Sequence, residues 1–293
     1  MPRYAYVNGR YCLHNNARVH IEDRGYQFAD GVYEVISIHN GGLVDEKGHL
    51  DRLDRSLNEL SMQWPVTRRV LEMIMRQLIR RNRVRNGLIY VQITRGVAPR
   101  DFRFPADAAP SLVMTTRHAV HDPNPLATEG VGVITIPDIR WKRRDIKTIA
   151  LLPQALGKQK AFEAGAFEAW QVDDDGAVTE GCSSNAWIVT KDGVLVTRNA
   201  TSSILNGITR QSVLAIAERH GLRFEERPFT VEESHNAREA FLTSATTYVM
   251  PVVRIDDHPV ANGAVGSLTA DLRQNYIGYA LNEGRSPGAP DAG

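Results

Sequence analysis

The chain of 293 residues has little cysteine, little net charge and no long apolar run. Its two cysteines, Cys12 and Cys182, are too few for a disulfide framework, which is typical of a reducing compartment. The formal net charge is +1, and the basic clusters lack interleaved aromatic residues, so nucleic-acid binding is not expected. No run reaches the roughly 18 apolar residues of a membrane span, and the N-terminus has no apolar signal segment. The sequence therefore predicts a cytoplasmic protein without membrane or nucleic-acid partners.

The composition is that of a globular protein. Hydrophobic residues make up 42% and charged residues 24%, which excludes disordered and fibrous classes. The length suffices for two cores. We expect a mixed α/β (α+β) fold with an N-terminal domain over 1–118, a linker over 119–129, a strand-rich domain over 130–283 and a disordered tail over 284–293. His118 and His121 flank the start of this linker without a carboxylate nearby, so a metal site is not expected.

Local patterns predict many of the elements. Hairpin turns are expected at Asn8-Gly9, Gly41-Gly42, Asp175-Gly176 and Asp192-Gly193. Leucines at spacings of three and four predict a helix from about His49 to the residues before Pro65. Further helices are expected over residues 67–83, 152–165, 207–221 and 267–281. Core packing is the ordinary explanation for these apolar stripes.

The stretch "DIRWKRRDIKTIALL" (138–152) carries a lysine directly into an apolar segment. Neighbouring cations and partial burial both favour the neutral amine of Lys147, which is the form that attacks a carbonyl carbon. The alternative is that Lys147 extends into solvent from a strand edge. We interpret the stretch as a strand edge that lines a pocket, with Arg140 and Lys147 facing a ligand.

Four other short stretches contain residues suited to ligand binding. "NGITR" opens a helix whose free N–H groups suit an anion, and Thr209 adds a hydroxyl. "LTSATT" gathers hydroxyls at Ser244, "HLDRL" offers Arg52, and "VTEGCSSN" holds Glu180 in a run of small polar residues. Each has an ordinary alternative as a helix cap, a strand former, a solvated arginine or a hairpin glutamate. Taken with Lys147, however, they are the groups that pyridoxal 5′-phosphate requires.

The order of these motifs, preceded by "DGVYEVI", resembles the class IV (fold type IV) pyridoxal phosphate-dependent aminotransferases. The likeness covers about residues 3–285. Within that family the chain is most similar to the D-amino-acid (D-alanine) aminotransferases, because "DIKTIALL" matches their pattern after the lysine. The "K-x-G-G-N-Y" pattern of the branched-chain enzymes is absent.

The resemblance implies a role for each candidate residue. Lys147 would be the Schiff-base lysine and would carry the proton between the substrate Cα and the cofactor. Glu180 would pair with the pyridine nitrogen, and Leu205 would pack against the ring. Tyr33 and Arg140 would line the substrate pocket. The phosphate would be bound by Arg52, Ile208, Thr209, Ser244 and Ala245.

One loop departs from the pattern of the D-amino-acid enzymes, which carry Arg-x-His after the "TRG" strand. Here Arg100 matches the arginine, Phe102 stands in place of the histidine, and Arg103 follows. The resemblance implies a homodimer in which this loop reaches the neighbouring subunit's site and binds the substrate carboxylate. Loss of the histidine removes a polar donor from that recognition.

The leading hypothesis is transamination between a D-amino acid and a 2-oxo acid by a ping-pong mechanism. Alternatives on the same fold are an (R)-selective amine transaminase and a branched-chain L-amino-acid aminotransferase. A different reaction class is a lyase of the aminodeoxychorismate type, which eliminates pyruvate. A non-catalytic binding protein on this scaffold is disfavoured, because Lys147, Glu180 and Arg52 are all retained.

Overall fold

The computed structural model describes residues 3–283. The described residues form two compact units: residues 3–120 with 146–150 and 280–283, and residues 121–145 with 151–279. The segment Ile146–Ala150, which contains Lys147, groups with the first unit although its chain neighbours on both sides belong to the second. The tail that was expected to be disordered, 284–293, lies outside the described residues.

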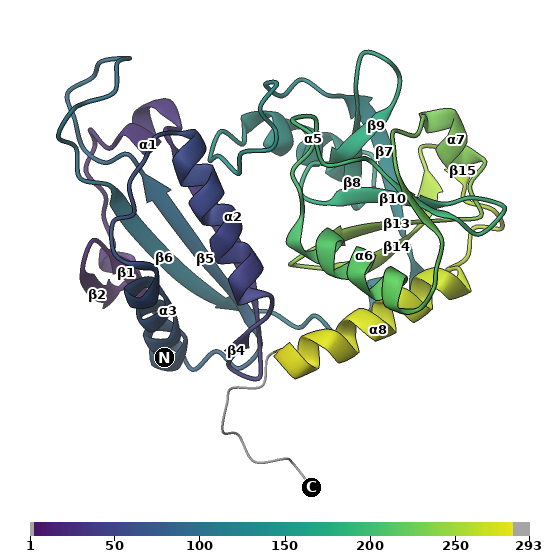
Figure 1. Cartoon of the computed structure of the whole chain (residues 1–293), viewed down its shortest axis with the longest axis horizontal. Coiled ribbons are helices and arrows are strands. Elements are labelled where there is room, and N and C mark those ends of the chain that lie inside the picture. The colour runs from purple at the N-terminus through teal and green to yellow at the C-terminus, as the bar shows by residue number, and fades with distance from the viewer. Residues whose placement is uncertain (1–2, 284–293) are drawn as a thin grey trace, which may run out of the picture. The chain divides into compact units, whose positions relative to one another are not determined.

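The first unit is a sheet with two helices across one face (Figure 1). The strand order is β2-β1-β6-β5-β3-β4, and every neighbouring pair is antiparallel. The strands are β1 (Tyr4–Val7), β2 (Arg10–Leu13), β3 (Gly31–His39), β4 (Gly42–Leu43), β5 (Gly87–Thr94) and β6 (Ser111–His118). The helical segments are η1 (His14–Asn16), α1 (Arg24–Phe28), α2 (Glu46–Glu59) and α3 (Arg68–Asn82).

Local sequence explains the main features of this unit. Asn8 and Gly9 both have positive φ, at 43° and 90°, which is the geometry of the predicted two-residue hairpin turn. Leu50, Leu53 and Leu57 of α2 are fully buried against the sheet, and each contributes about 2 kcal/mol of apolar burial. The predicted hairpin at Asn8-Gly9 and the predicted leucine-striped helix are therefore confirmed, but the helix begins at Glu46 and already ends at Glu59, before Pro65.

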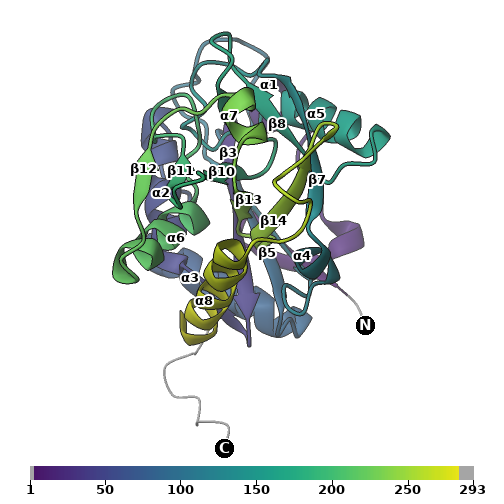
Figure 2. The same cartoon turned by 90° about the vertical axis from the view of Figure 1, so that its right-hand side faces the viewer.

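The second unit is built around a larger mixed sheet. Its strands follow the order β12-β11-β10-β13-β14-β7-β8-β9, with β15 beside β14; β13, β14 and β7 can be followed in Figure 2. The strands are β7 (Val131–Pro137), β8 (Glu168–Val172), β9 (Val178–Gly181), β10 (Asn185–Val189), β11 (Leu195–Thr197), β12 (Phe224–Glu226), β13 (Glu239–Ser244), β14 (Tyr248–Ile255) and β15 (His258–Pro259). The helices are α4 (Pro125–Glu129), α5 (Leu152–Glu163), α6 (Ile208–Arg219), α7 (Val231–His235) and α8 (Ser267–Glu283).

Parallel pairing and aromatic packing hold this unit together. β7 pairs in parallel with both β14 and β8, so it is covered on both edges and buries Val131 and Val133. Trp187 stacks on Phe241 of the neighbouring strand, with ring centroids 5.2 Å apart. Together the two units confirm the expected mixed α/β, strand-rich fold.

Two local predictions were wrong, and the expected linker contains a short helix. The turn after β3 lies at Asn40 and Gly41, one residue before the predicted Gly41-Gly42, because His39 pairs with Gly42. The stretch 138–151 forms no strand; Thr148 makes a single bridge with Val32. Part of the expected linker is helical, because Asn124 caps α4 and Pro125 occupies its first turn. Within residues 3–283, no helix combines the length and the apolar character needed to cross a bilayer.

Candidate functional site

Lys147 is held in a loop that is pinned to the first unit by its backbone. Its carbonyl accepts a hydrogen bond from the N–H of Tyr33 at 3.0 Å, and its own N–H donates to Ser56 Oγ at 3.4 Å. Ile149 N–H donates to the Gly31 carbonyl at 3.1 Å. The half-buried amine lies 4.2 Å from the centroid of the Tyr33 ring. This position agrees with the prediction that Lys147 is partly buried. The segment that carries it is a loop bound to β3 and α2, however, and not the predicted strand edge.

The alternative interpretation of Arg52 as a solvated arginine is wrong, because its side chain is only 9% exposed. Its Nε and Nη2 donate to the two oxygens of Glu34, both at 2.7 Å. Glu34 is fully buried on β3, next to Tyr33, and its Oε2 is also 2.7 Å from His49 Nδ1. This buried network of Glu34, Arg52 and His49 connects α2 to β3.

The network has a clear electrostatic character. Burial alone would raise the pKa of Glu34, but the Arg52 guanidinium and His49 outweigh burial and lower that pKa to about 2. Burial lowers the pKa of His49, against the opposing effect of Glu34. Glu34 is therefore a carboxylate at neutral pH, and both of its oxygens are engaged by Arg52.

The loop that carries Arg100 and Phe102 is exposed on the first unit. Phe102 is 85% exposed and its ring lies 5.5 Å from that of Phe28. The Arg100 guanidinium stacks 4.7 Å from the Phe28 centroid. Arg103, which follows Phe102 in the sequence, forms an ion pair with Asp101 at 2.6 Å. Phe102, packed beside Phe28, thus stands where a polar side chain was expected.

Glu180 is the centre of a second buried cluster, in the second unit. It lies on β9, where all residues are buried. Its carboxylate accepts hydrogen bonds from Arg140 Nη1, from Asn185 Nδ2 at 3.1 Å and from the N–H of Leu205 at 3.1 Å. Asn185 Nδ2 also donates to the Leu205 carbonyl at 2.8 Å. Glu180, Arg140 and Leu205 were all predicted site residues, and the structure brings them into contact.

Arg140 is shared between two acids. Its Nε and Nη2 donate to Asp138 at 2.9 and 2.7 Å, so only Nη1 reaches Glu180. Asp138 has a fully buried side chain and also accepts from Thr179 Oγ1 at 2.8 Å. Burial raises the pKa of Glu180, while Arg140 and the Leu205 N–H oppose that rise. Glu180 is thus a buried acid whose negative charge is compensated only in part, because Arg140 also neutralises Asp138.

The remaining predicted residues lie near the start of α6 and at the β13–β14 turn. Ile208 and Thr209 are buried in the first turn of α6, whose N-cap Gly207 offers no side-chain acceptor. A Cβ on Gly207 would lie 2.0 Å from Asn185 Oδ1, so glycine is needed there. Ser244 Oγ is 2.8 Å from Thr247 Oγ1 and accepts the Thr247 N–H at 3.2 Å, which closes the turn around Ala245.

Strand pairing relates these pieces to the Glu180 cluster. Asn185, which contacts Glu180, pairs with Thr243, the residue before Ser244. The second unit therefore brings Glu180, the α6 start and the Ser244 turn toward the same end of its sheet. Within the first unit, Lys147, Tyr33 and Arg52 meet around β3 and α2.

Several residues of these clusters were not predicted, namely Glu34, His49, Ser56, Asp138 and Asn185. The strand "GVYEVISIH" carried one usable signal. A glutamate amid apolar residues in a buried strand requires a charged partner. Asn185 gave no such signal, because it closes a run of small polar residues that any tight loop could contain.

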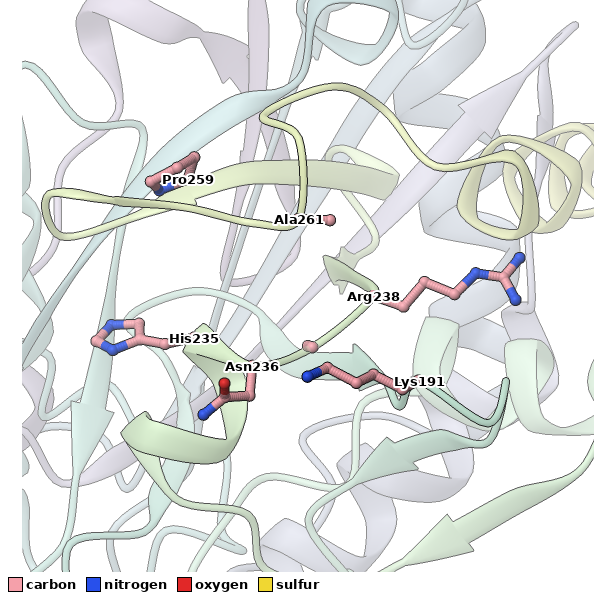
Figure 3. A pocket seen from close by; sticks show the side chains of 7 residues that line it. Lys191, His235, Asn236, Arg238, Pro259 and Ala261 are labelled. Carbon is pink, nitrogen blue, oxygen red and sulfur yellow. The ribbon is translucent and has the colours of Figure 1, made fainter.

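A separate hollow of about 420 Å³ lies on the second unit. It is lined by Lys191, His235, Asn236, Ala237, Arg238, Pro259 and Ala261 (Figure 3). None of the predicted site residues lines it. Across residues 3–283, no group of three or more His, Cys, Asp and Glu side chains is arranged to hold a metal ion.

Comparisons with known proteins agree with the family that the order of the motifs indicated. Residues 31–255 match the family described as amino-transferase class IV. The chain is 43% identical to a D-alanine aminotransferase of Bacillus licheniformis over 276 residues, covering 94% of this chain and 96% of that protein. It is 40% identical to the D-alanine aminotransferase of Staphylococcus epidermidis, with the same coverage. The T.th. branched-chain amino acid aminotransferase with pyridoxamine 5′-phosphate has a TM-score of 0.89 at 25% identity, covering 97% of this chain and 95% of that one.

Proposed function

This chain belongs to the class IV aminotransferases, and we propose that it transfers the amino group of a D-amino acid to a 2-oxo acid. The observation that carries this proposal is the 43% identity to a D-alanine aminotransferase across nearly the full length of both chains. Aminotransferases of this class use pyridoxal 5′-phosphate. D-Alanine or D-glutamate would be the donor, and pyruvate or 2-oxoglutarate the acceptor.

The residues present fit that cofactor. Glu180 is a buried acid whose arginine is mostly committed to Asp138, so its carboxylate suits a further positive group such as a protonated pyridine nitrogen. The first turn of α6 has no side-chain cap and carries the Thr209 hydroxyl, which suits a phosphate. The turn from Ser244 to Thr247 adds further hydroxyls and backbone N–H groups.

We assign the following roles to the chain's own residues. Lys147 would hold the cofactor covalently and, once released, carry the proton to and from the substrate Cα. Glu180 would keep the ring nitrogen protonated, and Leu205, fixed by Asn185, would pack against the ring. When bound, the cofactor supplies an aldehyde carbon and a ring that accepts electrons. The phosphate would be bound by Arg52, Ile208, Thr209, Ser244 and Ala245, and the substrate by Tyr33, Arg140, Arg100 and Phe102.

The reaction would proceed in two half-reactions. The amino donor binds first and leaves as its 2-oxo acid, and a second 2-oxo acid then binds and leaves as the new amino acid. Tyr33 is well placed to restrict the motion of the released amine, because its ring lies 4.2 Å from Lys147 Nζ.

Reduction with borohydride tests the assignment of Lys147. Purified protein with pyridoxal phosphate is expected to be yellow, and peptide mapping after reduction should find the label on Lys147. The variant Lys147→Ala should bind no cofactor covalently and lose activity. Lys191→Arg, at the separate hollow, is the matched control and should label normally. A colourless protein or a label on another lysine would contradict the assignment.

A substrate panel tests the donor class. We expect activity with D-alanine and D-glutamate, with pyruvate or 2-oxoglutarate as acceptors. Activity confined to L-leucine or to (R)-1-phenylethylamine would instead indicate a branched-chain enzyme or an amine transaminase. Release of pyruvate from aminodeoxychorismate without an acceptor would indicate a lyase.

We also propose a homodimer in which the loop with Arg100 and Phe102 serves the neighbouring subunit's site. Supporting it, Phe102 and Phe104 lie two residues apart on this loop and are 85% and 60% exposed, so both rings are accessible to a second subunit. Sedimentation velocity should give twice the chain mass. A cytoplasmic location is proposed from the two free cysteines, and cell fractionation tests it.

For the domain organisation, we propose that residues 1–118 and 130–283 act as the two domains. The range 119–129 would connect them. The division between compact units after Val120 supports the position of this linker. Limited proteolysis should cut there first.

A further inference from the structure

The C-terminal helix α8 touches both elements to which we assign phosphate binding in the second unit. Residues 267–283 lie beyond the part of the chain that matches the family, 31–255. Arg273 and Tyr276 are three residues apart and therefore project from the same face of this helix. We infer that these two side chains position the phosphate-binding elements, so that α8 sets the affinity for the cofactor's phosphate.

Arg273 holds the β13–β14 turn. It is 4% exposed, and its Nη1 donates to the carbonyls of Thr247 at 3.0 Å and Val249 at 2.7 Å. Its Nη2 donates to the His121 carbonyl at 2.8 Å, and Asp122 lies 3.6 Å away. The planar guanidinium thus links the end of the Ser244–Thr247 turn to His121, the residue at which the chain enters the second unit.

Tyr276 holds the start of α6. Its side chain is 1% exposed, and its hydroxyl is 3.4 Å from Thr209 Oγ1. Its ring packs edge-on against Tyr248, the first residue of β14, with centroids 5.0 Å apart. Tyr248 has a φ of 61°, an uncommon conformation for an aromatic residue, at the point where the turn ends. One face of α8 therefore contacts Thr209 on one side and the turn on the other.

The physical argument concerns preorganisation. A phosphate binds most tightly to N–H groups and hydroxyls that are already fixed in position, because their ordering then costs nothing on binding. Neither Arg273 nor Tyr276 needs to touch the phosphate for this effect. They are positioning residues, and the inference rests on the proposed binding of the phosphate by Thr209 and the Ser244 turn.

The test compares the binding of pyridoxal phosphate with that of pyridoxal, which lacks the phosphate. Kd values for the cofactor-free protein are measured by equilibrium dialysis. Arg273→Lys keeps the charge but loses the fork, and we expect its Kd for pyridoxal phosphate to rise about tenfold. Tyr276→Phe removes one hydroxyl, and we expect a rise of about threefold. The Kd for pyridoxal should stay unchanged in both.

Gln274→Ala, on the exposed face of α8, is the control and should match the wild type in both Kd values. Equal weakening of pyridoxal and pyridoxal phosphate would overturn the inference, since a general loss of folding affects both ligands. Unchanged binding of pyridoxal phosphate in both variants would also overturn it. If Arg273→Lys does not fold, Tyr276→Phe alone decides. A wild-type protein that binds no pyridoxal phosphate would refute the proposed function itself.

Discussion

Each unit of this molecule buries a glutamate beside an arginine, and the two pairs behave in opposite ways. In the first unit, Glu34 accepts two hydrogen bonds of 2.7 Å from the fork of Arg52. In the second unit, Glu180 receives only Nη1 of Arg140, because the rest of that fork binds Asp138. The pKa of Glu34 is lowered to about 2, whereas that of Glu180 is raised.

The difference shows that residue types alone do not determine what a buried ion pair does. Burial favours the neutral acid in both cases, and the outcome depends on how much positive charge each carboxylate receives. Glu34 receives two N–H groups of Arg52 and a contact from His49, and so anchors α2 to β3. Glu180 shares its arginine with Asp138, which leaves it suited to pair with a cationic ligand. Predictions that remove each acid in turn test this distinction.

The largest expected effect is the loss of activity in Glu180→Gln. An amide does not favour a protonated ring nitrogen, so kcat should fall on the order of 10²–10³-fold. Stability should change little, because Arg140 keeps its pair with Asp138. Steady-state kinetics with D-alanine and thermal unfolding of the cofactor-free protein measure the two quantities. A stable variant with nearly normal kcat would remove Glu180 from the mechanism.

The reciprocal variant, Glu34→Gln, should lose stability. Removing one partner of a buried pair leaves Arg52 uncompensated, at a cost of about 3 kcal/mol at pH 7. Because the folded pKa of Glu34 is about 2, below its ordinary 4.5, its contribution is present above pH 4.5 and is lost as the pH falls through about 2. Urea unfolding should therefore show a wild-type advantage that shrinks over this range. An advantage that stays constant with pH would mean that the charge of Glu34 is not its source.

The sequence predicted what is encoded locally and missed what depends on packing. The Asn8-Gly9 hairpin and the leucine-striped helix α2 follow from neighbouring residues and were predicted correctly. The segment around Lys147 is a loop and not the strand edge that its sequence indicates. Its alternation of charged and apolar residues resembles a strand. Its hydrogen bonds, however, go to Tyr33 and Ser56, which both lie more than 90 residues earlier in the sequence.

The same distinction applies to the candidate site. Arg52, Lys147 and Glu180 stood in recognisable motifs, so they could be proposed from the sequence. The partner that orients Arg52 could not, because Glu34 lies 18 residues earlier and meets it only when α2 packs on β3. Likewise, nothing local links Arg273 of α8 to the turn after β13.

Of the three substitutions in this comparison, the one with the smallest expected effect is at Phe102, outside both buried networks. Its ring is 85% exposed and touches Phe28, whose ring also contacts the guanidinium groups of Arg24 and Arg100. Phe102→His would restore the polar donor of the related D-amino-acid enzymes. A hydrogen bond to the substrate carboxylate should lower the KM for D-alanine about tenfold, with kcat and the melting temperature nearly unchanged. Phe104→His, on the same loop, is the control and should leave KM unaltered. If Phe102→His also leaves KM unaltered, the loop does not bind the substrate carboxylate, and the role assigned to Arg100 fails with it.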